Sequence, residues 1–177
     1  MQISFCKTFM EFLETAKLQL IINKNMIPQI NNPPGSTTAD NFTIGYLLMH
    51  NAQYTDALLF WSSQDKGNAA VQYNTALCHF FAKEYSFAKE NIENSIRNIR
   101  ISNPIQRNAA INNLLEIEAQ SDNYLNPLIS ASLNFCPELV LLRANRLLYD
   151  ICLQLGDTQT AQRIASTLAN KHFSNVK

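Results

Sequence analysis

Two stretches, YTDALLFW (Tyr54–Trp61) and YSFAKENI (Tyr85–Ile92), share one spacing and decide the fold. In each, an aromatic residue is followed by Ala three positions later and by a bulky apolar residue four positions after that, and the second stretch begins 31 residues after the first. Apolar residues at these offsets lie on one face of an α-helix. A fixed period of this length is typical of stacked helical hairpins, in which each unit buries one face against the next.

The pattern recurs once more near the C-terminus, from Gly156 to Ala161. Ala88 and Ala161 are 73 residues apart, which is about two periods, so a degenerate unit is expected between them. Its second helix is expected at Leu125–Phe135, with Pro127 near its start. The predicted repeat domain spans 40–177, with hairpins at about 41–66, 68–100, 104–136 and 138–172. Small residues are expected where helices approach closely; they are Gly45, Ala57, Ala76, Ala88 and Ala161.

These residues resemble the pattern of the tetratricopeptide repeat family, whose units are pairs of antiparallel helices of about 34 residues. The second unit resembles it best, through Tyr73, Asn74 and Ala76 in its first helix and Tyr85 and Ala88 in its second. The resemblance implies an all-α fold of stacked antiparallel hairpins in a TPR-like right-handed superhelix. It also implies a protein-binding groove lined by the first helix of each hairpin.

Composition and charge narrow the classes of function. Of the 177 residues, 46% are hydrophobic and 16% are charged, which is typical of a folded chain. Fourteen basic residues balance fourteen acidic ones, so no overall positive field attracts nucleic acid or anionic lipid. Nucleic-acid binding is therefore disfavoured, and a chain of zero net charge has little electrostatic resistance to self-association.

The N-terminal region is predicted to be organised separately from the repeats. Residues 1–27 carry an apolar stripe that predicts an amphipathic helix, and residues 28–39 form a linker rich in Pro, Asn and Gly. The helix has a balanced polar face instead of the basic face that membrane surfaces prefer. Neither a signal peptide nor a membrane span is recognised in the sequence. A cytoplasmic location is the default expectation.

Catalysis, cofactors and metal binding are not expected. The four cysteines are scattered without a Cys-x-x-Cys pair, so a zinc framework is not indicated. Cys78 and His79 are adjacent, and their side chains leave a helix about 100° apart, which is poor geometry for a nucleophile and its base. Glu116 and Glu118 diverge in the same way. The four glycines form no phosphate-binding loop.

The resemblance places an apolar, aromatic groove on the first helices of the first two units. The groove positions it implies are Phe42, Tyr46, Met49, His50, Tyr73, Leu77, Phe80 and Phe81. Exposed aromatic surface of this extent is unusual unless something covers it. The principal hypothesis is a non-catalytic scaffold that binds a peptide or helix of a partner protein. In the last unit, Arg143 and Arg146 lie at helical spacing near Asp150. They are a further candidate contact for an acidic partner, and a solvated face with a local ion pair is the alternative.

Self-coverage of the groove is the alternative. The chain's own N-terminal helix or a second copy of the chain would then fill it, and the protein would be a structural helical-repeat protein that forms homodimers. A minor alternative is a secretion chaperone built from tetratricopeptide repeats, since such proteins are similar in layout to an N-terminal helix followed by hairpins.

Overall fold

The computed structural model describes four stretches of the chain, namely residues 38–101, 109–129, 131–168 and 173–176. All of them belong to a unit that begins at Thr37. These stretches contain helices and no strand, so the prediction of an all-α fold is confirmed for them. The predicted N-terminal helix, 1–27, and nearly all of the predicted linker, 28–39, lie outside the described residues.

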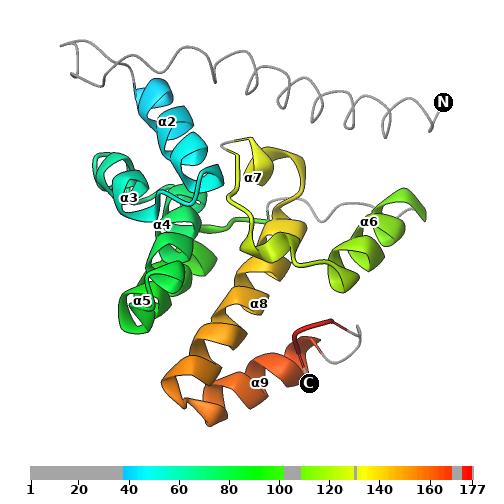
Figure 1. Ribbon diagram of the computed structural model, residues 1–177. Coiled ribbons are helices and arrows are strands. Elements are labelled where there is room, and N and C mark those ends of the chain that lie inside the picture. Colours follow the sequence, from blue (N-terminus) through cyan, green and yellow to red (C-terminus); the bar gives the residue numbers. More distant parts are fainter. Residues whose placement is uncertain (1–37, 102–108, 130, 169–172, 177) are drawn as a thin grey trace. The chain divides into compact units, whose positions relative to one another are not determined.

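Three pairs of consecutive helices form hairpins in the described part of the chain (Figure 1). The pairs are α2 (Thr38–His50) with α3 (Tyr54–Ser62), α4 (Ala69–Phe81) with α5 (Tyr85–Asn98), and α8 (Pro137–Leu155) with α9 (Thr158–Leu168). Between the second and third pairs lie α6 (Ala109–Gln120), a single 3₁₀ turn η1 (Asn123–Leu125) and the short helix α7 (Ser132–Phe135).

The same type of backbone turn closes each of the three hairpins. Each turn has one residue in the left-handed region, Ala52 at φ 57°, Lys83 at φ 62° and Gly156 at φ 71°. The N–H of the next residue then donates to the carbonyl oxygen five residues earlier, as in the Schellman motif. These bonds join Gln53 to Leu48 at 2.9 Å, Glu84 to His79 at 2.8 Å and Asp157 to Cys152 at 2.9 Å. The left-handed residues of the first two turns, Ala52 and Lys83, are 31 residues apart, so these two hairpins repeat in the backbone with the same spacing as in the sequence.

Small residues allow the helices of these hairpins to pack closely. Ala57, Ala88 and Ala161 are all buried. A Cβ atom at Gly45 on α2 would lie 2.9 Å from the indole ring of Trp61 on α3, so the indole leaves no room there for a side chain. The two helices come this close because one of them has glycine where the other has its largest side chain.

The third hairpin expected at 104–136 does not form in the described residues. Instead α5 packs directly on α8, and Lys89 Nζ donates to Asp157 Oδ2 at 2.7 Å between α5 and the turn before α9. In place of the helix expected at Leu125–Phe135, the described residues form η1, a non-helical stretch at 126–129 and the four-residue α7. Pro127 supplies part of the reason, because it lacks an N–H and favours extended backbone at the residue before it.

Candidate functional site

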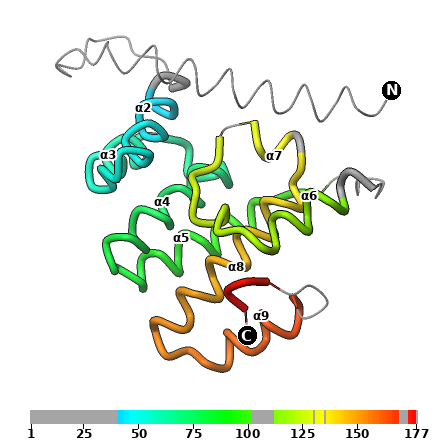
Figure 2. The backbone as a smooth tube through the Cα atoms, turned by 45° about the vertical axis from the view of Figure 1, so that its right-hand side comes forward, coloured from blue at the N-terminus to red at the C-terminus, as the bar shows by residue number. Residues whose placement is uncertain are grey.

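The surface of α4 that was expected to form an open groove is covered by the chain itself. Residues 123–129, called the resident segment below, lie between α4 and α8 (Figure 2). Asn74 Nδ2 donates to the carbonyl oxygen of Leu128 at 2.9 Å, and the N–H of Leu128 donates to Asn74 Oδ1 at 2.7 Å. The hydroxyl of Tyr73 donates to the carbonyl oxygen of Tyr124. Side chains of α4 therefore bind the main chain of this segment.

Two buried side chains anchor the resident segment, Tyr124 and Leu128. The hydroxyl of Tyr124 donates to Asp150 Oδ2 at 2.5 Å, and the guanidinium of Arg146 lies 4.2 Å from the centre of its ring. Burial raises the pKa of Tyr124, and the hydrogen bond to Asp150 raises it further, so the phenol remains a donor. Burial also raises the pKa of Asp150. These contacts hold the segment on α8 as well as on α4.

Arg143 and Arg146 are engaged inside the protein, which corrects the expectation that they contact an acidic partner. Arg143 binds Glu118 of α6 through two hydrogen bonds, from Nε at 2.9 Å and from Nη2 at 2.8 Å. Arg146 is 0% exposed, and burial lowers its pKa. It donates to four oxygens, of Glu118 (main chain, 2.6 Å), Ser121 (main chain, 2.9 Å), Ser174 (side chain, 2.9 Å) and Asn175 (side chain, 2.8 Å). Arg146 thus joins α6, η1 and the C-terminal residues to α8.

Four of the expected groove residues belong to the core, namely Phe42, Met49, Tyr73 and Leu77. Tyr73 and Leu77 are 0% exposed, Met49 is 4% exposed, and Phe42 packs edge-on against Trp61 with ring centroids 4.8 Å apart. The assignment of Phe42, Tyr73 and Leu77 to an exposed groove is wrong, because the resident segment covers Tyr73 and because Phe42 faces α3. The half-buried members of the set are Tyr46, Phe80 and Phe81, of which Phe80 packs against Phe81 and Tyr85.

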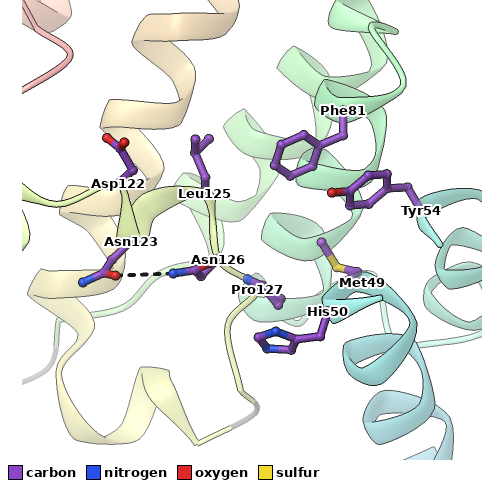
Figure 3. Close-up of a pocket in the computed structure, with 9 residues that line it drawn as sticks. All are labelled: Met49, His50, Tyr54, Phe81, Asp122, Asn123, Leu125, Asn126 and Pro127. Carbon is purple, nitrogen blue, oxygen red and sulfur yellow. Dashed lines mark hydrogen bonds between the residues drawn. The ribbon is translucent and has the colours of Figure 1, made fainter. Parts of the chain in front are cut away.

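An open pocket of about 430 Å³ remains beside the resident segment (Figure 3). Met49 and His50 from the end of α2, Tyr54 from α3 and Phe81 from α4 form one side, and Asp122 with the resident segment forms the other. The rings of Tyr54 and Phe81 are stacked, with centroids 4.6 Å apart and planes 18° apart. The pocket therefore contains three of the expected groove residues, Met49, His50 and Phe81.

Asp122 is the single charged residue among the nine described residues that line this pocket, apart from the titratable imidazole of His50. Partial burial lowers the pKa of His50, which favours its neutral form. His50 also packs against Tyr46 with ring centroids 4.6 Å apart, and burial raises the pKa of Tyr46. The pocket thus combines aromatic rings, a thioether and one carboxylate.

Cys78, His79 and Glu118, which were candidates for catalysis in the sequence, do not line this pocket. Burial raises the pKa of Cys78 to about 12, so its thiol is protonated at neutral pH. His79 pairs with Glu84 Oε2 at 2.7 Å instead of with that thiol. Glu118 is buried against Arg143. Among the described residues, no group of three His, Cys, Asp or Glu side chains is arranged to hold a metal ion.

Sequence reasoning missed the residues that bind the resident segment, chiefly Asn74, Tyr124 and Leu128. Asn74 belongs to the repeat pattern. Its place next to Tyr73 on a predicted helix was the one indication in the sequence that this helix makes a polar contact. Leu125 and Pro127 fall within the helix predicted at Leu125–Phe135, and Tyr124 directly precedes it. A proline preceded by Asn126 within an apolar stretch was a sign of extended backbone.

No family model, no curated protein and no solved structure matches this chain. Within the described ranges, no helix has the length and apolar character needed to span a membrane.

Proposed function

We propose that this protein is a non-catalytic interaction module that binds a polypeptide segment of a partner at the open pocket beside the resident segment. The observation that carries the proposal is the pairing of Asn74 with both main-chain groups of Leu128. A planar side-chain amide matches one peptide group in donor and acceptor. The surface of α4 therefore carries side-chain groups that bind extended polypeptide, and in this protein they bind the resident segment.

The open pocket supports the proposal because it continues this surface and is not filled. Its side chains are of the kinds that dominate binding at protein interfaces, with two stacked aromatic rings and a methionine. Tyr54 is half-buried and Phe81 is packed against it, so both are held in place before binding. Preorganised aromatic side chains lose little conformational entropy when a ligand packs on them.

Site-specific photocrosslinking in cells of the source organism tests this proposal. A benzoylphenylalanine at position 54 would place the reactive group in the pocket, and the same residue at Leu153, which is exposed on α8 and does not line it, is the matched control. We expect a discrete crosslinked protein from position 54 and none from position 153. Equal crosslinking from both positions, or none from position 54, would contradict the proposal.

A structural homodimer is the second candidate function. It is supported by a second hollow of about 650 Å³ over α3, α4 and α5, which includes Leu59. Leu59 is 68% exposed, and the nearby Phe87, packed on His79 of the same hollow, is 58% exposed. Light scattering should give twice the monomer mass, and Leu59→Ser with Phe87→Ser should return it to the monomer. A monomer at all concentrations would exclude this candidate.

A further inference from the structure

We propose that the open pocket beside the resident segment takes a cationic side chain, lysine or arginine, from the partner polypeptide. This inference rests on the proposed function and names the chemistry of the residue that enters the pocket. It depends on the aromatic wall formed by Tyr54 and Phe81, on the carboxylate of Asp122 and on the absence of Lys or Arg from the described lining.

The aromatic wall suits a cation because the faces of aromatic rings carry partial negative charge. Tyr54 and Phe81 are stacked with centroids 4.6 Å apart, so each ring covers one face of the other, and the surface offered to a cation is the outer face of the stack. The hydroxyl of Tyr54 points into the pocket (Figure 3), where its oxygen can accept a hydrogen bond from an ammonium or guanidinium. A long aliphatic stem would pack on Met49 and Leu125 while its charged end reaches the polar side.

The charges around the pocket favour a cation over an anion. Asp122 lines the pocket on the side opposite the rings and is exposed. The arginines of α8 belong to other contacts, since Arg143 binds Glu118 and Arg146 is buried among main-chain and side-chain oxygens. An anionic residue of a partner would face the carboxylate of Asp122, whereas a cationic one would neutralise it.

The basis for choosing a polypeptide side chain over a free small cation is the surface next to the pocket. Asn74 and Tyr73 already bind main-chain groups of Leu128 and Tyr124 there. Asn126, beside Pro127 at the rim, is exposed and retains hydrogen-bonding groups for a neighbouring chain. A residue anchored by its side chain in the pocket would therefore find a polar group for its own backbone in Asn126, while Asn74 and Tyr73 remain bound to the resident segment.

Titration of the full chain with three blocked tripeptides tests the inference, observed by NMR of ¹³C-labelled Tyr and Phe rings. The probes are acetyl-Gly-Arg-Gly-amide, the same peptide with citrulline, which is a neutral analogue of nearly the same shape, and the same peptide with norleucine, which is apolar. We expect the arginine peptide to shift the Tyr54 and Phe81 signals and to bind about 3- to 5-fold more tightly than the other two. Asp122→Asn should remove most of this preference. Glu90→Gln, an exposed carboxylate on α5 outside this pocket, should leave it unchanged.

The outcomes separate this inference from the proposed function. If citrulline or norleucine binds as tightly as arginine, or if Asp122→Asn retains the arginine preference, the cation assignment is overturned and the interaction module stands. If none of the peptides shifts the Tyr54 and Phe81 signals, both are overturned. Tyr54→Leu serves as the second variant: it should lower arginine binding more than norleucine binding, and equal losses would count against the aromatic contact.

Discussion

Asn74 and Leu128 exchange two hydrogen bonds across 54 residues of sequence, with Asn74 Nδ2 donating at 2.9 Å and Asn74 Oδ1 accepting at 2.7 Å. Asn74 is 0% and Leu128 is 2% exposed, so water does not compete for either bond. This pair fixes the resident segment on α4 and leaves the aromatic pocket open beside it.

Replacing Asn74 should release the resident segment. Asn74→Ala leaves the N–H and the carbonyl of Leu128 without these partners, which should lower the free energy of unfolding by about 2–4 kcal/mol. Urea unfolding measures this loss, and faster hydrogen exchange at the Leu128 amide locates it. Thr75→Ala is the control, because the Thr75 hydroxyl donates only to Val71 of its own helix at 2.8 Å. Unchanged protection at Leu128 would refute the assignment.

Arg146 should not be replaceable by lysine. Its guanidinium bonds four oxygens and covers the ring of Tyr124, and a lysine ammonium has too few donors in the wrong geometry to do both. Arg146→Lys should lower the free energy of unfolding by about 2–4 kcal/mol and expose residues 173–176 to carboxypeptidase. Arg163→Lys, on the exposed face of α9, should change neither measurement. Equal effects of the two variants would contradict the role assigned to the guanidinium of Arg146.

Gly45→Ala should disturb the first hairpin. The added Cβ would lie 2.9 Å from the indole of Trp61, which is 1% exposed and packed against Phe42, so we expect a loss of about 1–3 kcal/mol. Trp61 is the one tryptophan of the chain, and its fluorescence should change with the mutation. Gly67→Ala is the matched control, because its nearest new contact is the exposed side chain of Asp65 at 3.2 Å. Normal Trp61 emission in Gly45→Ala would show that the helices can separate freely.

Adding glycine at one hairpin turn and removing it from the equivalent position of another should change the stability of the protein in opposite directions. Lys83 has φ 62°, which costs energy for a residue with a Cβ, so Lys83→Gly should stabilise the protein by about 0.5–1 kcal/mol. Gly156→Ala should destabilise it by a similar amount, since Gly156 has φ 71°. Thermal unfolding measures both. Ala82→Gly is the control, with φ −76°, and should lower the melting temperature; a rise there would invalidate the argument from backbone conformation.

Acid should weaken the contact between α5 and the turn before α9. The hydrogen bond from Lys89 holds the pKa of Asp157 at about 2, below its ordinary value of 3.8. A carboxyl whose pKa is lower in the folded state stabilises the protein above its unfolded pKa, and this contribution disappears as pH falls from about 4 to about 2. Urea midpoints at pH 5 and pH 2.5 should therefore differ less in Asp157→Asn, which can still accept from the Thr160 N–H, than in the original chain.

Lys89→Gln provides the control for that titration. It removes the cation and leaves the carboxyl, so the pKa of Asp157 should rise and the acid-dependent loss should again become smaller. An acid-dependent loss of the same size in all three proteins would show that other groups cause it.

The helical elements could be predicted from local pattern because their causes are local. Apolar residues spaced by three and four, the Ala three residues after the start of each second helix and Gly156 after α8 all act within one hairpin. The aromatic pocket was partly predicted for the same reason, since Met49, His50 and Phe81 lie at helix ends whose positions follow from the turns at 51–53 and 82–84.

The covering of α4 was not predictable from that pattern. Pro127 made a helix at 125–135 unfavourable, but nothing near it indicates that Asn74 would bind Leu128 or that Arg146 would bind Ser121 and Ser174. Periodicity assigns residues to the face of a helix and does not say which distant segment packs on that face. Tyr73 and Leu77 therefore look like exposed groove residues in the sequence and are core residues in the folded chain.

The sequence by itself determined an all-helical chain, the 31-residue period and the small residues at the close contacts, because these depend on helix geometry and on residues near one another along the chain. Only the tertiary structure decided that α8 packs directly on α5 and that the resident segment occupies α4. It also decided that the two arginines are engaged internally and that the aromatic pocket remains open. The physical reason is that buried polar groups must find partners, and those partners lie tens of residues away, selected by the fold as a whole.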